Sequence, residues 1–278
     1  MYTAYWGLSR QPFDNGDQPE FFHRGEPHQA ALLKLRYVLE SGLGTGLLVG
    51  GTGSGKSFLV GQLAHEMPER FAPFVRVVYP HFTAAEFLCY VAAALGRGNA
   101  EENPAALEER TLDRTVRRIE DRLAVHARNG RHPVIVIDEA HQIDDPRVLQ
   151  AVLSLLNLQP RNDIDFSLLL VGERSLVPRL RRFAQLDERI GVRGLLRALN
   201  RAETEDYVAH RLRAAGRATP IFRHEAFDAL HDLSGGVPRR INRLCDFALL
   251  VGYADGLREI TPDEFAAVAE ELVGALPD

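Results

Sequence analysis

The feature that most restricts how this chain can fold is the octapeptide GGTGSGKS, which runs from Gly50 to Ser57. It matches the phosphate-binding pattern GxxxxGK followed by Ser or Thr, in which a glycine-rich turn lets backbone N–H groups approach a polyphosphate. Apolar residues before the loop indicate a buried strand, and those after it indicate a helix whose positive N-terminal end faces the phosphates. Lys56 supplies a point charge for the β- and γ-phosphates, and Ser57 offers a hydroxyl to Mg²⁺. We expect a nucleotide to be bound by Gly50, Gly51, Thr52, Gly53, Ser54, Gly55, Lys56, Ser57 and Phe58.

A second motif, PVIVIDEAH, occupies residues 133–141. Its uninterrupted apolar run is typical of a strand buried on both faces of a parallel sheet. Asp138 and Glu139 follow at the carboxyl end of that strand, where ligands bind in open α/β sheets. We expect Asp138 to help hold Mg²⁺ and Glu139 to accept a proton from the water that attacks the γ-phosphate. The alternative is an acidic cap at a helix start, and His141 is interpreted as a helix-start residue near the site.

Two positions farther along the chain are candidates for contact with the γ-phosphate. Glu173 follows an apolar strand predicted at residues 166–171 and is expected to touch the γ-phosphate or the attacking water. A further carboxylate beside a polyphosphate requires an offsetting charge, from Arg174 or from Mg²⁺. Arg189, in the tetrapeptide DERI, is expected to reach the γ-phosphate of a neighbouring subunit, because a guanidinium stabilises the spreading negative charge of phosphoryl transfer. The alternative for Arg189 is an ordinary surface arginine.

The sequence pattern changes from mixed α/β to all-helical near Ala202. It predicts an α/β nucleotide-binding domain over residues 1–200, with an N-terminal wrap over residues 1–27, and a small helical lid over residues 201–278. The aromatic residues of the wrap either follow the adenine pocket or simply anchor the segment. Arg239 stands at a helix start after a glycine turn, so we expect it to lean over the nucleotide, unless it is a surface residue. Lid helices are expected at residues 203–214, 224–233, 238–253 and 262–273.

The composition limits the classes of partner. A chain of 278 residues with 45% hydrophobic content suits one large domain and a small one. The net charge of −5 and the pI near 6.1 argue against a dominant surface for polyanions, so DNA binding would require a local basic patch. Cys89 and Cys245 are expected to be buried thiols in a reducing cytoplasm. The sequence has no apolar run of membrane-spanning length and no basic and apolar leader, so it predicts neither a membrane span nor a secretion signal. We therefore expect a cytoplasmic location.

Several motifs together resemble one family. They lie within residues 2–272 and include YWGLSRQPF, GGTGSGKS, VIVIDEAHQI, LLLVGERSL, RAETEDYVAHRLRAAG and SGGVPRRINRLCDFAL. The sequence resembles the AAA+ ATPases of the general secretion pathway A type and the related pilus-biogenesis ATPases. The resemblance implies an oligomer that sandwiches ATP and Mg²⁺, with Arg189 as the arginine finger and Arg239 as the lid arginine called sensor 2. Glu173 stands where proteins of that family carry a glutamine.

The larger members of that family continue into a transmembrane segment and a peptidoglycan-binding module. A motor without an envelope anchor is therefore expected here. DEAH also occurs in two-domain helicases, but this sequence has no second nucleotide-gripping domain.

Three functions fit these residues. The first is a self-assembling ATPase that acts on a partner protein of an envelope secretion or pilus system. The second is a DNA-associated AAA+ regulator of the transposition or replication type. The third is a nucleotide-gated scaffold that hydrolyses ATP only weakly.

Overall fold

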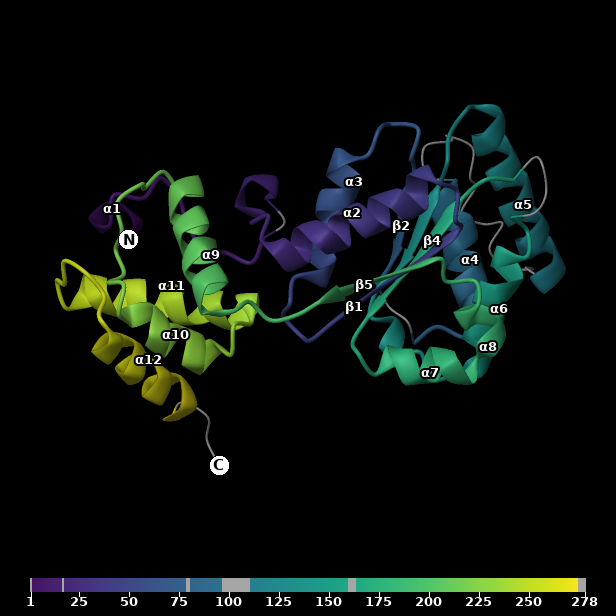
Figure 1. Ribbon diagram of the computed structural model, residues 1–278. Helices are drawn as coiled ribbons and strands as arrows, with labels where there is room; N and C mark the ends of the chain where they lie inside the picture. Colours follow the sequence, from purple (N-terminus) through teal and green to yellow (C-terminus); the bar gives the residue numbers. More distant parts are fainter. Residues whose placement is uncertain (1, 17, 79–80, 97–110, 160–163, 275–278) are drawn as a thin grey trace. The chain divides into compact units, whose positions relative to one another are not determined.

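The computed structural model describes residues 2–16, 18–78, 81–96, 111–159 and 164–274 (Figure 1). Residue contacts divide the chain into two compact units. The sheet unit comprises residues 30–50 and 63–195, and the helical unit comprises residues 1–29, 51–62 and 196–278. The last junction between the units lies close to the boundary expected at residue 200. The N-terminal segment and the phosphate loop group with the helices, and the assignment of domains to residues 1–200 and 201–278 stays a prediction.

A five-stranded sheet forms the centre of the sheet unit (Figure 1). Its strands are β1 (Thr45–Gly50), β2 (Phe74–Val77), β3 (Val134–Ile137), β4 (Ser167–Gly172) and β5 (Val192–Leu196). The order is β2-β3-β4-β1-β5, and β3 pairs in parallel with β2 and β4, while β4 also pairs in parallel with β1. Every residue of β1, β3 and β4 is buried, which is why these strands read as continuous apolar runs. The predicted parallel sheet with flanking helices is confirmed.

The edge strand β5 has no counterpart in the sequence prediction, which proposes no strand between residue 171 and the helical region. Its burial alternates in part, with Arg193 and Leu195 exposed and Gly194 and Leu196 buried. A strand at the edge of a sheet is open to solvent along one side, so that it tolerates charged and exposed residues. The exposed arginine interrupts the apolar pattern, so the sequence does not indicate a strand here.

Helices pack on the sheet and on one another, and α4 and α5 lie side by side (Figure 1). Their shared core consists of buried aliphatic and aromatic side chains, among them Phe87, Val91 and Ile119. The start of α4 is closed by a capping box, in which Thr83 Oγ1 accepts from the backbone N–H of Glu86 at 3.3 Å. Among the described residues, the helices between the N-terminal segment and residue 190 are α2 (Glu26–Glu40), α3 (Lys56–Glu66), α4 (Ala84–Leu95), α5 (Leu112–Arg128), α6 (Pro146–Leu156), α7 (Leu176–Arg182) and α8 (Ala184–Asp187), with a short 3₁₀ turn η3 (Ala140–Gln142).

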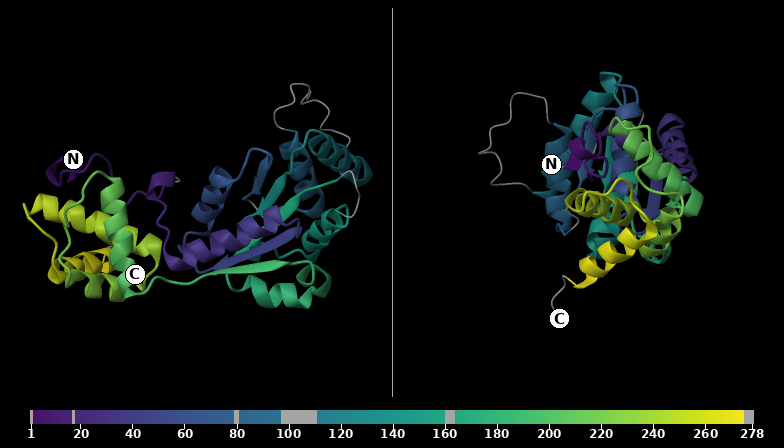
Figure 2. Two further views of the ribbon diagram at one scale, coloured as in Figure 1. Left: turned by 45° about the horizontal axis from the view of Figure 1, so that its top comes forward. Right: turned by 90° about the vertical axis from the view of Figure 1, so that its left-hand side faces the viewer.

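The helical unit contains the four helices predicted for the lid, each within two residues of its expected bounds. They are α9 (Arg201–Ala214), α10 (Ala226–Ser234), α11 (Pro238–Ala254) and α12 (Pro262–Gly274). The last three pack against one another (Figure 2). Asn200 and Glu203 form a capping box at α9, and Pro238 occupies the first turn of α11.

The N-terminal segment packs on this unit through α1 (Tyr2–Tyr5) and the 3₁₀ turn η1 (Pro19–Phe21). Trp6 is buried, and its indole N–H donates to Leu249 O at 2.8 Å. Phe13 and Phe21 belong to the same apolar cluster. Most aromatic residues of the segment therefore anchor it to the helices. Phe22 differs, because its ring lies beside Phe58 of α3.

Candidate functional site

The phosphate loop is a turn between the last residue of β1 and the first residue of α3. Gly53 and Gly55 have φ values of 75° and 91°, in the left-handed region that favours glycine. The backbone N–H of Ser54 donates to Gly51 O at 3.2 Å, which closes the turn. Lys56 is buried, and its Nζ donates to Gly51 O at 3.1 Å. A glycine turn that leads into a helix N-terminus beside a lysine is a geometry that suits a polyphosphate.

Two segments of the helical unit contact this loop. The backbone N–H of Arg239 donates to Gly53 O at 3.2 Å, so that the start of α11 lies against the turn. His28 Nε2 lies 2.9 Å from Ser54 O, and burial lowers the pKa of His28. The buried Oγ of Ser54 has no hydrogen-bond partner in the described part of the chain. The phosphate loop, Phe58 and Arg239 are thus neighbours.

Asp138 follows β3 in the sheet unit and is only 1% exposed. Its Oδ2 accepts from Nη2 of Arg76 at 2.7 Å, and its Oδ1 accepts from the backbone N–H of Glu139 at 2.9 Å. Arg76 lies on β2, next to β3 in the sheet. A buried carboxylate requires a compensating charge, which this guanidinium supplies. Arg76 is a site residue that the sequence analysis misses, although a charged residue inside an apolar strand is a signal in itself.

Glu139 and Glu173 both lie next to His141. Glu139 has φ 52° and ψ 32°, a left-handed conformation that is rare for a side chain of this size. His141 Nδ1 lies 3.4 Å from Glu139 Oε2, and it accepts from the backbone N–H of Glu173 at 3.3 Å. The Nε2 atom lies 3.7 Å from Glu173 Oε1. Arg174, one of the groups expected to offset the charge of Glu173, is exposed. The group that lies between the carboxylates of Glu139 and Glu173 is the imidazole of His141.

Arg189 lies on the surface of the sheet unit, two residues after the end of α8. Its side chain is exposed, and Nη2 donates to Asn157 Oδ1 at 3.0 Å. The guanidinium is therefore accessible to a second molecule. The structure brings the predicted residues together in two groups, one around the phosphate loop in the helical unit and one around Asp138 in the sheet unit.

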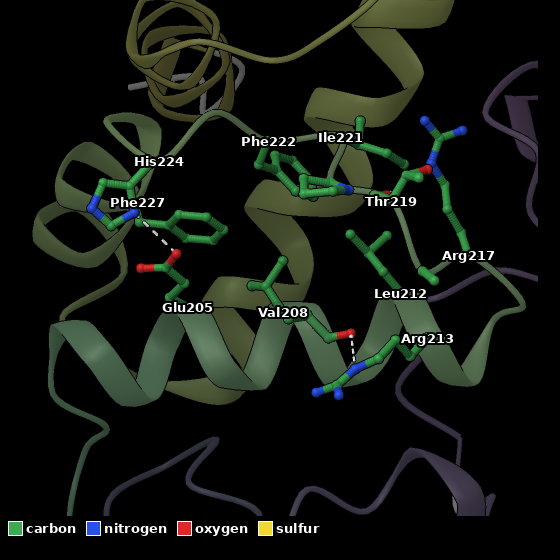
Figure 3. Close-up of a pocket in the computed structure, with 13 residues that line it drawn as sticks. Glu205, Val208, Leu212, Arg213, Arg217, Thr219, Ile221, Phe222, His224 and Phe227 are labelled. Carbon is green, nitrogen blue, oxygen red and sulfur yellow. Dashed lines mark hydrogen bonds and ion pairs between the residues drawn. The ribbon is translucent and has the colours of Figure 1, made fainter.

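A separate pocket of about 400 Å³ opens beside α9 and α10 in the helical unit (Figure 3). Val208, Leu212 and Phe227 contribute to its apolar lining. At its rim Glu205 pairs with His224 at 3.0 Å, and Arg213 Nε donates to Ala209 O of its own helix. The charged groups are engaged with their neighbours, which makes this pocket a weaker candidate for a polyphosphate than the glycine loop.

Comparison with known proteins gives one family match. A family model described as "AAA domain" matches residues 39–180. General secretion pathway protein A of Aeromonas hydrophila is 32% identical over 276 residues, which cover 99% of this chain and 49% of that protein. The chain thus spans about half the length of this curated relative.

The fold is similar to several solved structures. The Aeropyrum pernix ORC2 protein matches with a TM-score of 0.72 and 18% identity over 98% of this chain and 74% of the other. Cdc6p of Pyrobaculum aerophilum matches with a TM-score of 0.70 and 16% identity over 96% and 74%. The RuvB branch migration motor of Thermotoga maritima matches with a TM-score of 0.59 and 20% identity over 89% and 70%. At these identities the likeness concerns the fold alone. In the described ranges, the helices are all too short or too polar to cross a bilayer.

Proposed function

The chain belongs to the AAA family of P-loop ATPases, and we propose that it binds ATP with Mg²⁺ and hydrolyses the bond to the γ-phosphate. The observation that carries this proposal is the register of the sheet. On β4, Val49 of β1 pairs with Gly172, and Ile137 of β3 pairs with Leu170. These two rows are two residues apart, about 7 Å along the strand. Strand β1, which leads into the glycine loop, and strand β3, which leads into Asp138, therefore end at the same edge of the sheet, where open α/β sheets bind ligands.

The donor atoms fit a magnesium-bound triphosphate. The loop glycines and the N-terminus of α3 suit the phosphate oxygens, and Lys56 adds positive charge. Ser57 and Asp138 offer a hydroxyl and a carboxylate, the oxygen ligands that Mg²⁺ prefers. Bound Mg²⁺ would neutralise charge on the β- and γ-phosphates. Glu139 would accept the proton of the attacking water, and Glu173 would contact that water or the γ-phosphate.

We propose further that the protein acts as a self-assembled oligomer. Arg189 supports this, because its exposed guanidinium is available to the γ-phosphate of a neighbouring copy. Arg239 supports a role for the helical unit, because it is hydrogen-bonded to the phosphate loop and would respond to the γ-phosphate. The 32% sequence identity with general secretion pathway protein A supports the proposal that the partner is a protein of an envelope secretion or pilus system. Cys89 and Cys245 are free thiols, which suit the reducing cytoplasm that also supplies ATP, although only Cys245 is buried as expected and Cys89 is half-buried.

The test compares the native protein with Lys56→Ala and Glu139→Gln. Lys56→Ala should weaken Mg·ATP binding about 10- to 100-fold in calorimetry, the value of a hydrogen bond to a charged group. Glu139→Gln should bind normally while its turnover falls about 10²- to 10⁴-fold, the usual contribution of a general base. Absence of Mg·ATP binding by the native protein would refute the proposal. Equal turnover of the native protein and Glu139→Gln would favour the nucleotide-gated scaffold.

Titration with duplex DNA separates the DNA-associated regulator from the secretion or pilus ATPase. A protein that contacts several phosphates should lose DNA affinity steeply as salt rises. The similarity to ORC2 and RuvB is a similarity of fold and does not choose between these functions.

A further inference from the structure

The position of His141 between Glu139 and Glu173 is a feature that the proposed hydrolysis does not explain. Glu139 and His141 follow β3, and Glu173 follows β4, so the two carboxylates come from neighbouring strands. Nδ1 faces Glu139 Oε2 at 3.4 Å, and Nε2 faces Glu173 Oε1 at 3.7 Å. One ring therefore contacts both acidic side chains with different nitrogen atoms.

The position of the His141 side chain is fixed by its neighbours. Its side chain is only 15% exposed. A Cβ placed on Gly172 would lie 3.1 Å from His141 N and 3.4 Å from Nδ1, so the glycine at the end of β4 leaves room for the ring. The guanidinium of Arg179 donates to His141 O at 2.9 Å and also to Ile143 O, which holds the backbone from α7. Two elements, β4 and α7, thus determine where His141 lies.

The charges explain why such a ring is useful. Two carboxylates at adjacent strand ends repel each other and repel a triphosphate. An imidazole whose Nδ1 accepts from the backbone N–H of Glu173 has only its Nε2–H left to donate, and Nε2 faces Glu173 Oε1. Arg179 is engaged with backbone oxygens and with Asp144 at 3.0 Å. Glu139 sits on a strained left-handed backbone and is partly exposed, so its side chain needs a neighbour to select one orientation.

We propose that His141 is a positioning residue for ATP hydrolysis, which holds the Glu173 side chain and keeps it apart from the Glu139 carboxylate. This inference rests on the proposed function, in which Glu139 accepts the proton of the attacking water. His141 itself neither contacts the nucleotide nor takes part in the proton transfer. Contacts of 3.3 to 3.7 Å are long for hydrogen bonds, and catalytic contacts of this kind shorten once substrate is bound.

The experiment measures kcat, KM and Mg·ATP affinity for His141→Ala and His141→Asn. His141→Ala should lower kcat about tenfold to a hundredfold, because misplacement of a catalytic group by about 1 Å costs about 10² in rate. KM and the affinity for Mg·ATP should change less than about twofold, since the proposed role of the ring includes no contact with the nucleotide. His141→Asn should recover at least threefold of kcat, because its amide N–H can also donate to the Glu173 carboxylate. His65→Ala, an exposed histidine at the end of α3, is the matched control and should have native kinetics.

A double-mutant cycle with Glu173→Gln isolates the separation of charge. In the Glu173→Gln background, where one carboxylate charge is gone, His141→Ala should cost less than about threefold in kcat. Native kcat in His141→Ala, or equal losses in both backgrounds, would overturn the inference. A loss of kcat by Glu139→Gln with none by His141→Ala leaves the proposed function intact, whereas a native protein that does not hydrolyse ATP refutes the proposed function itself. His141→Asn keeps a polar side chain at this position, so its kcat tests the inference even if His141→Ala fails to fold. A kcat of His141→Asn as low as that of Glu139→Gln would count against the inference.

Discussion

Replacement of Arg76 by methionine tests whether the ion pair with Asp138 supports the buried end of β3. Arg76→Met keeps an unbranched side chain on β2 while removing the guanidinium. The Asp138 carboxylate, 1% exposed, then loses the group that lies 2.7 Å from its Oδ2. The backbone N–H of Glu139 still donates to Oδ1, but this group carries no full charge.

The expected loss follows from the geometry of the pair. Two unit charges about 4 Å apart interact by about 4 kcal/mol at an effective dielectric constant near 20. Removal of one partner of a buried pair costs about 3–5 kcal/mol. The Arg76 side chain is 33% exposed, so water can replace part of the lost interaction. We therefore expect Arg76→Met to lower the free energy of unfolding by about 2–3 kcal/mol at pH 7.

Urea unfolding followed by circular dichroism measures this quantity, with Arg117→Met as the matched control. Arg117 also pairs with an aspartate, Asp113, but both side chains are more than two-thirds exposed, at 73% and 71%. The control should leave the free energy of unfolding nearly unchanged, because solvent screens an exposed ion pair. Addition of Asp138→Asn to Arg76→Met removes the uncompensated charge and should restore about 1 kcal/mol or more.

Equal stability of Arg76→Met and Arg117→Met would refute this reasoning. The reasoning would also be refuted if Asp138→Asn destabilised the Arg76→Met variant as much as it destabilises the native protein. The two substitutions would then act independently.

Three further changes test the site and the helical unit. Gly53→Ala places a Cβ at φ 75° and 2.8 Å from Arg239 Cβ, so Mg·ATP affinity in calorimetry should fall about tenfold, whereas Gly61→Ala, whose Cβ meets nothing within 4 Å, should bind normally. Arg189→Ala should keep Mg·ATP affinity but lose turnover at high protein concentration, and activity on mixing with a hydrolysis-deficient subunit would reveal action across the interface. Burial lowers the pKa of His23 to about 4, so its contribution to stability is present above about pH 6.5 and is lost as the pH falls toward 4; the melting temperature should drop less over this range in His23→Gln.

The sequence predicts the parts of the fold whose signals are local. Strands β1, β3 and β4 are recognisable because burial on both faces demands continuous apolar residues. The helix α11 is recognisable because Pro238 follows a glycine turn. By contrast, β5 carries exposed Arg193 and Leu195 at a sheet edge, so its pattern resembles a surface segment. Its pairing with the sheet depends on residues far away in the chain.

The same distinction applies to the candidate site. The phosphate loop and Asp138 are visible in the sequence because their chemistry is written in short motifs. The contact of Arg76 with Asp138 depends on the pairing of β2 with β3, and the contact of His28 with Ser54 joins α2 to the loop. No motif reports such contacts, since each joins residues that are more than twenty positions apart. An interpretation of His141 from the sequence alone therefore has no means of finding its second carboxylate.

The register of β3 on β4 couples the arrangement of carboxylates to the hydrophobic core. Ile137 pairs with Leu170, and Glu139 and Glu173 extend beyond these two residues by two and three positions. A slip of one residue would move one carboxylate relative to the other by about 3.3 Å and would turn the apolar side chains of the strand to the opposite face. The core thus resists any slip that would remove His141 from its place between the carboxylates. The phosphate loop and Arg239 are held by α3 and α11 instead, so substitutions there can change nucleotide binding while leaving the spacing of Glu139 and Glu173 unaltered.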